Sequence, residues 1–247
     1  MEDKGIAGDA FSYNICLNVY ASIPDVKEME KLLLKMEKDP MLIKFNSYVV
    51  ATKGYMKAGN PEKASKVLKR CEHLIKGKNE RLANETLLTL YDSMGKKNDV
   101  YRIWKKLKNR GKVYISSYLC VMRRLENLDD IDGAEKIFSE WEANRVYFDI
   151  RVPNFLIAIY CKNGHLEKAE SITERLLESG LMRRNYMALG YCSHYQMEKA
   201  FETLKKAILA SVTRWKPRIR SWATCVNYLQ SNGDAKREKE IKRLLEE

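Results

Sequence analysis

The amino-acid sequence predicts an all-α protein: a right-handed α-solenoid superhelix of about seven helix-turn-helix repeats, each ~35 residues long. Three observations predict this fold. A short phrase recurs along the chain, apolar residues recur with the 3.6-residue period of a helix, and no segment reads as a strand. Because one helical hairpin cannot bury its apolar face alone, neighbouring hairpins are expected to stack into one continuous core with a concave groove.

The recurring phrase is clearest at Tyr160–Ala169, which reads YCKNGHLEKA. A second copy lies at Tyr55–Ala64 and a third at Tyr191–Ala200. Weaker copies start at Tyr20, Tyr91, Leu125 and Leu229. The seven starts are separated by 35, 36, 34, 35, 31 and 38 residues. This period excludes the HEAT and armadillo repeats, which are about 40–47 residues long.

Each phrase is interpreted as the turn between two helices. The leading aromatic residue or leucine ends the first helix. A glycine four residues later supplies the left-handed conformation that a helix C-terminus needs. These glycines are Gly59, Gly95, Gly164 and Gly233. A small residue early in the second helix permits close approach of the first, and these residues are Ala64, Ala134, Ala169 and Ala200. The core stripe of the second helices includes Trp104, Phe138 and Trp141.

The repeats assign residues 10–247 to a single solenoid, preceded by a tail at residues 1–9. The predicted repeats are 10–44, 45–80, 81–114, 115–149, 150–180, 181–218 and a partial seventh at 219–247. We expect no domain boundary, because contacts in a solenoid pass from neighbour to neighbour. The tail is neither a secretory signal nor an Arg-rich transit peptide, so we expect no targeting peptide in this chain.

The composition excludes several classes of protein. No run of 18 apolar residues is present, so a membrane-spanning helix is not expected. The six cysteines include no CxxC pair, which favours reduced thiols over a disulfide framework or a zinc site. A phosphate-binding glycine loop, an HExxH motif and a Ser-His-Asp grouping are also absent. We therefore expect neither an enzyme nor a bound metal or other cofactor.

The formal net charge of +12 is unevenly distributed. Residues 61–113 hold 15 Lys and Arg against 6 acids, whereas residues 125–180 hold 6 against 12. Residues 205–233 are basic without any acid and include Trp215 and Trp222, a mixture that suits a phosphate backbone with stacked bases. The candidate RNA contacts in these basic segments are Lys105, Lys106, Arg214, Lys216, Arg218 and Arg220. A solvated helix face is the simpler interpretation of each. The acidic middle suits a basic protein partner.

The phrase at Tyr160–Ala169, together with Ser12-Tyr13-Asn14, resembles the pentatricopeptide repeat family over about residues 10–247. The segments Tyr101–Trp104, Gly133–Ile137 and Arg151–Asn154 are similar to plant organellar members of its P class, some of which associate with the mitochondrial ribosome. A peptide-binding tetratricopeptide module is the alternative, although only Trp222 lies roughly where that repeat requires a tryptophan.

The resemblance implies that single-stranded RNA binds in the concave groove. There the fifth residue of a repeat hydrogen-bonds a base edge, the last residue assists, and the second residue sandwiches the base. The implied RNA contacts are Phe11, Asn14, Asp149, Arg151, Asn154 and Asn185. The remaining fifth positions are Val49, Glu85, Leu119 and Ala223. No repeat combines Asn at its fifth position with Asp at its last. Either the assigned register slips in several repeats, or the protein does not read a long sequence; the second explanation is favoured.

Two functions therefore compete. The first is RNA binding in organellar RNA metabolism (processing, stability, splicing or translation), in mitochondria or alternatively in chloroplasts. The second is a scaffold subunit of the mitochondrial ribosome that contacts the rRNA backbone and ribosomal or other organellar proteins. RNA is the expected partner in both, with no DNA and no membrane.

Overall fold

The computed structural model describes residues 9–23, 26–77, 79–109, 111–178, 191, 197–209 and 219–246. These residues fold into thirteen α-helices and one 3-10 turn, and the described part of the chain contains no strand. The all-α prediction is thereby confirmed. None of the described helices is both long and apolar enough to cross a membrane. The chain divides into two compact units, Met1–Leu128 and Asp129–Glu247.

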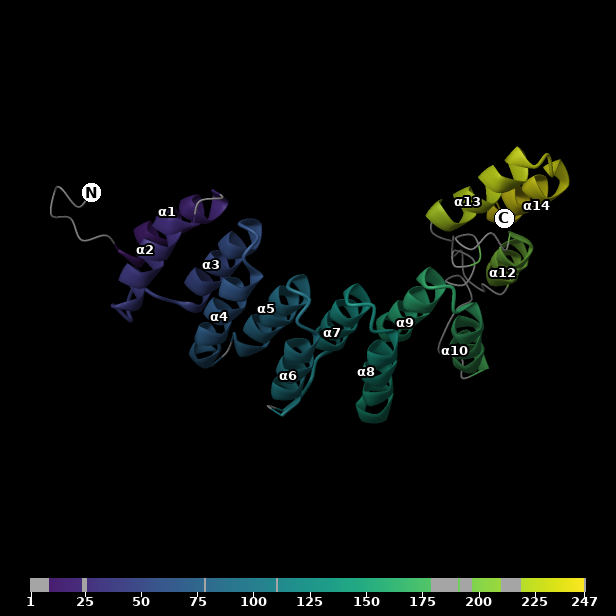
Figure 1. Ribbon diagram of the computed structural model, residues 1–247. Coiled ribbons are helices and arrows are strands. Elements are labelled where there is room, and N and C mark those ends of the chain that lie inside the picture. The colour runs from purple at the N-terminus through teal and green to yellow at the C-terminus, as the bar shows by residue number, and fades with distance from the viewer. Residues whose placement is uncertain are drawn as a thin grey trace. The chain divides into compact units, whose positions relative to one another are not determined.

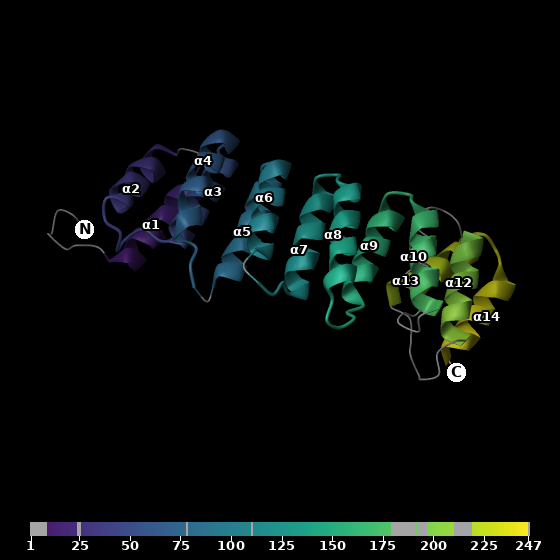
Figure 2. The same ribbon diagram turned by 90° about the horizontal axis from the view of Figure 1, so that it is seen from below.

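The first unit contains three complete helical hairpins followed by the first helix of a fourth. Its helices are α1 (Ala10–Ser22), α2 (Lys27–Glu37), α3 (Phe45–Lys57), α4 (Pro61–Cys71), α5 (Glu80–Ser93), α6 (Lys97–Lys108) and α7 (Ile115–Asn127), with η2 (Glu72–Leu74) after α4. The first helices α1, α3, α5 and α7 form one layer, and the second helices α2, α4 and α6 form the other (Figures 1 and 2).

The second unit repeats the same two-helix motif. Its helices are α8 (Ile131–Asn144), α9 (Arg151–Lys162), α10 (Leu166–Glu178), α12 (Met197–Leu209), α13 (Ile219–Ser231) and α14 (Ala235–Glu246). Helices α9 and α10 pack as one hairpin, and α13 and α14 as another. Of the first helix expected in repeat six, only Tyr191 is among the described residues. The unit boundary falls inside the predicted fourth repeat, so a single solenoid over 10–247 stays a prediction.

The helix starts follow the predicted repeat boundaries closely. Helices α3, α7 and α13 begin at residues 45, 115 and 219, as predicted, and α5 and α9 begin within one residue of prediction. The four small residues Ala64, Ala134, Ala169 and Ala200 are completely buried. Trp104, Phe138 and Trp141 are also buried, which confirms their assignment to the core.

The turn glycines adopt the left-handed conformation that the repeat phrase predicts. Gly59, Gly95, Gly164 and Gly233 have φ angles of 70°, 67°, 77° and 70°. In the turn phrase of the predicted fourth repeat the same place is occupied by Asp129, whose φ is 54°. A side chain in this conformation is strained by contact of its Cβ with the backbone, so each glycine closes its hairpin turn without that penalty.

Replacing Gly59 with alanine should destabilise the protein by about 1 kcal/mol. A Cβ at this position would meet no atom within 4 Å, so the penalty comes from the φ angle alone. Urea unfolding measures it, and Asp129→Gly is the reciprocal control because it should move stability in the opposite direction. An alanine variant as stable as the parent protein would contradict the assigned role.

Candidate nucleic-acid interface

The second residue of each described repeat from one to five is exposed at or near the start of its first helix. Phe11 is 72% exposed and Leu82 is 60% exposed, and Asn46, Ser116 and Arg151 are also exposed. By contrast, the third residues Ser47 and Ser117 are fully buried. Apolar side chains held in solvent at equivalent positions offer surfaces on which a planar base can stack.

Asn14, the fifth residue of repeat one, is half-buried between α1 and α3. Its Nδ2 donates to the carbonyl oxygen of Ala10 at 2.6 Å, and its Oδ1 accepts from the Ser47 hydroxyl at 2.8 Å. An amide has two donor hydrogens and two acceptor lone pairs, so both groups retain capacity for a base edge. Asn14 therefore connects two repeats and still presents a polar group beside Phe11.

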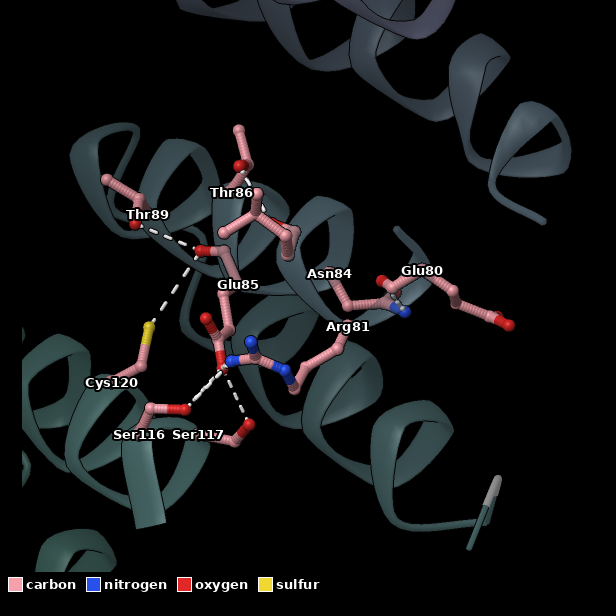
Figure 3. A network of polar contacts seen from close by, with 10 residues as sticks. Glu80, Arg81, Asn84, Glu85, Thr86, Thr89, Ser116, Ser117 and Cys120 are labelled. Atoms are coloured by element: carbon pink, nitrogen blue, oxygen red, sulfur yellow. Dashed lines mark hydrogen bonds and ion pairs between the residues drawn. The ribbon is translucent and has the colours of Figure 1, made fainter. Parts of the chain in front are cut away.

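Glu85, the fifth residue of repeat three, lies at the centre of a polar network between α5 and α7 (Figure 3). Its Oε1 accepts from the hydroxyls of Ser117 at 2.6 Å and Ser116 at 3.2 Å, and from the Arg81 guanidinium at 3.0 Å. The Arg81 guanidinium also lies 5.2 Å from the ring centroid of Tyr114, the last residue of the repeat. This carboxylate is already satisfied by the protein, and its charge is balanced by Arg81.

The remaining fifth residues give an uneven base-reading surface. Val49 is buried, and Leu119 is half-buried; neither can hydrogen-bond a base edge. Asn154 is 7% exposed, and its buried Oδ1 has no hydrogen-bond partner among the described residues. Asn185 lies outside the described residues.

Asp149 and Arg151, assigned as the last residue of repeat four and the second of repeat five, form an ion pair. The Arg151 guanidinium donates to both carboxylate oxygens at 2.7–3.2 Å, and the Arg151 backbone N–H donates at 3.0 Å. The hydrogen bond from the Arg151 side chain lowers the pKa of Asp149, and the reciprocal bond raises the pKa of Arg151. Arg151 therefore stays charged, with an exposed side chain that can also reach a phosphate.

The predicted basic contacts are not all on the same layer as these residues. Lys105 and Lys106 lie on α6, in the layer opposite the first helices that carry Phe11, Asn14 and Glu85 (Figure 1). Arg220 lies in α13. The other three basic candidates, Arg214, Lys216 and Arg218, lie outside the described residues.

Ion pairs between successive second helices connect neighbouring repeats, and sequence reasoning did not find them. In the first unit Lys63 pairs with Glu30 at 2.5 Å, Arg70 with Glu37 at 3.0 Å, and Lys96, at the cap of α6, with Glu62 of α4 at 3.1 Å. In the second unit Lys168 pairs with Glu135 at 2.6 Å and Arg175 with Glu142 at 3.2 Å. The signal available in the sequence was the separation of 33–34 residues between each basic residue and its acidic partner.

The most elaborate of these connections joins Glu72 of η2 to Tyr91 and Arg102. The Tyr91 hydroxyl donates to Glu72 Oε1 at 2.7 Å, and the Arg102 guanidinium donates to both carboxylate oxygens at 2.7 Å. Burial and this hydrogen bond raise the pKa of Tyr91. Burial alone would raise the pKa of Glu72, but the bonds from Arg102 and Tyr91 outweigh it and lower that pKa. The carboxylate is thus held in its charged form.

The described residues offer groups that can bind a ligand. No three His, Cys, Asp or Glu side chains gather there as metal ligands would. Burial raises the pKa of Cys71 to about 12 and that of Cys161 to about 11, so both thiols stay protonated at neutral pH. Amide, carboxylate and hydroxyl groups beside exposed apolar side chains can recognise a ligand by hydrogen bonding and stacking.

Comparison with known proteins gives this geometry a family context. The PPR repeat family matches residues 11–41, 47–73 and 152–181. A mitochondrial pentatricopeptide repeat-containing protein of Arabidopsis thaliana is 38% identical over 252 residues, covering 100% of this chain and 51% of the relative. The large ribosomal subunit protein mL101 (rPPR4) of Arabidopsis thaliana is 31% identical over 188 residues, covering 73% of this chain and 38% of the relative. The chain thus spans about half the length of the first relative and 38% of the length of the second.

Solved structures show the same fold. The crystal structure of the pentatricopeptide repeat protein PPR10 from maize matches with a TM-score of 0.56 and 16% identity, covering 99% of this chain and 40% of that protein. PPR10 in complex with an 18-nt psaJ RNA element matches with a TM-score of 0.55 and 20% identity, covering 100% of this chain and 36% of that protein. These matches agree with the helical-hairpin repeats and confirm the α-solenoid fold. The chain belongs to the pentatricopeptide repeat family.

Proposed function

We propose that this chain is a non-catalytic RNA-binding protein that holds single-stranded RNA along its first helices. One observation carries the proposal: the second residues of repeats one to five are exposed, and in repeats one, three and five the fifth residue (Asn14, Glu85 or Asn154) is polar. In repeat one this places Phe11, a stacking surface, next to Asn14, a donor and acceptor for a base edge. Asn154, Asn185, Asp149 and Arg151 complete the proposed contacts.

The proposed setting is RNA metabolism in the mitochondrion, in a protein of the plant organellar P class. The support is a 38% identical relative named as mitochondrial. A further support is the solved complex of PPR10, a protein of the same fold, with an RNA element. Binding without chemistry would act by shielding or remodelling an RNA segment.

The second candidate function is a scaffold subunit of the mitochondrial ribosome. It is favoured by the relative mL101, which is named as a large ribosomal subunit protein. It is also favoured by the uneven base-reading surface, since Val49 and Leu119 are apolar and Glu85 is occupied by Arg81 and two serines. Such a subunit would contact rRNA through phosphates and would not need to read bases.

The two candidates are separated by measuring affinity for a panel of single-stranded RNAs at two salt concentrations. Sequence-selective binding with a shallow salt dependence supports the first function. Uniform binding with a steep salt dependence supports the second, because phosphate contacts release counterions. A protein that binds no RNA at low salt would exclude both.

Replacing Asn14 with alanine should weaken binding to the tightest RNA of that panel roughly ten-fold, since one base contact is worth about 1–3 kcal/mol. Ser47→Ala is the matched control, because it removes the same Asn14–Ser47 hydrogen bond without removing the base-reading amide. The control should bind within about two-fold of the parent protein. Equal losses in the two variants would assign Asn14 to repeat packing alone.

A further inference from the structure

In the first unit, net positive charge lies mainly on the second helices. Helices α4 and α6 together hold nine Lys and Arg against two acids, a net charge of +7. The first helices α1, α3, α5 and α7 together hold five against four, a net charge of +1. The proposed base-reading layer is therefore almost neutral, and the opposite layer is strongly basic.

The acids near α4 and α6 are paired, which leaves the surplus charge on exposed lysines. Glu62 pairs with Lys96, and both Glu72 and Asp99 pair with Arg102. Three lysines, Lys66, Lys69 and Lys105, are exposed and form no ion pair with any described residue. We call these three residues the lysine triad.

The repeat places the lysine triad on one continuous surface. Helices α4 and α6 begin 36 residues apart, at Pro61 and Lys97, and follow each other in the same layer (Figure 1). With that offset, Lys69 and Lys105 occupy equivalent positions, as do Lys66 and Arg102. The Lys96–Glu62 pair joins α6 at its cap to the first turn of α4. Basic side chains thus lie in matching rows on consecutive helices.

Neither α4 nor α6 carries a fully exposed aromatic side chain. Trp104 of α6 is 2% exposed and therefore unavailable to a base, and Tyr101 is half-buried. The large exposed apolar residues of α1 and α5 belong to the other layer, and they are Phe11, Ile15, Val19 and Leu82. Proteins that hold single strands combine basic residues with exposed aromatics, whereas duplex RNA hides its bases and presents phosphates and 2′-hydroxyls. A basic surface without exposed aromatic side chains therefore suits double-stranded RNA better than a single strand.

We propose that the outer surface of α4 and α6, centred on the lysine triad, binds the phosphate backbone of double-stranded RNA. This inference rests on the proposed RNA-binding function and adds a second surface to it. The first helices would then hold unpaired nucleotides while the second helices hold a neighbouring stem. The equivalent helices of the other unit, α8 and α10, hold three basic residues against eight acids, so they offer no such surface.

The test compares the full chain with two triple variants. Lys66→Gln, Lys69→Gln and Lys105→Gln together remove the triad. Lys136→Gln, Lys236→Gln and Lys239→Gln together remove the same charge from exposed lysines on α8 and α14. The probes are a fully paired RNA hairpin and an unstructured oligouridine of equal length, each titrated at several salt concentrations. Circular dichroism melting confirms that each variant is folded.

The triad variant should bind the hairpin roughly ten-fold more weakly, with a salt slope about 3 smaller, while the control variant and oligouridine binding change little. Equal weakening in both variants would overturn the inference, because only total charge would then matter. A parent protein that binds oligouridine but not the hairpin would overturn it and leave the proposed function intact. Competition by polyglutamate as strong as by the hairpin would also overturn it, since the surface would then take any polyanion. If neither RNA binds, the proposed function itself fails.

Discussion

Replacing Ala169 with tryptophan should lower the melting temperature of the protein by roughly 5 °C or more, because overpacking a close helix contact costs about 1–3 kcal/mol and often more for so large a side chain. Ala169 is completely buried early in α10, the second helix of its hairpin with α9. Small residues occupy the equivalent place at Ala64, Ala134 and Ala200, all completely buried. A tryptophan there must push α10 away from its neighbours.

The control for this substitution is Ser171→Trp, two residues further along the same helix. Ser171 is exposed, so the added ring should enter solvent and change the melting temperature little. Both variants can be melted by circular dichroism at neutral pH. An unchanged melting temperature for Ala169→Trp would mean that the small residue is not needed for hairpin packing.

Replacing Glu72 with glutamine should destabilise the first unit by about 1–2 kcal/mol at neutral pH. The carboxylate accepts hydrogen bonds from the buried Tyr91 hydroxyl and from Arg102, and the neutral amide cannot satisfy both donors equally. Glu62→Gln is the matched control. It removes the same charge from an exposed pair with Lys96, and such pairs contribute little.

The same substitution should flatten the acid dependence of stability. The pKa of Glu72 is lower in the folded protein than in the unfolded chain. Its contribution to stability is therefore present above the unfolded pKa and is lost as the pH falls through the folded pKa. Between pH 7 and the acidic range below pH 4.5, the melting temperature of the parent protein should therefore fall further than that of Glu72→Gln. A parallel decline in the two proteins would show that Glu72 does not carry this effect.

The helical hairpins were predictable because local chemistry determines them. A left-handed turn favours glycine, as at Gly59 and Gly164, so the turn can be recognised from residue type and spacing alone. Asp129 takes the same conformation without the expected glycine, and the regular repeat still located its turn. The core positions of Trp104 and Trp141 followed from helical periodicity for the same reason.

Contacts between repeats were not predictable in the same way. Gly54 carries no turn signal, yet a Cβ there would lie 2.5 Å from the Met29 sulfur and 3.0 Å from the Cα of Ala21. Glu85 was recognised as a fifth position, but its capture by Arg81, Ser116 and Ser117 depends on how α5 and α7 meet. Side chains some 30 residues apart come together only when the packing of successive hairpins is known.

The sequence by itself determined the all-α repeat architecture, the helix starts and the buried small residues, because these depend on the periodicity and backbone preferences of short segments. Tertiary structure alone decided which side chains of neighbouring helices meet. It joined the Asn14 amide to Ser47 and brought Glu72 to Tyr91 and Arg102. The physical reason is that hydrogen bonds and ion pairs act over a few ångströms. Their partners are therefore set by the packing of neighbouring helices, which no single repeat encodes.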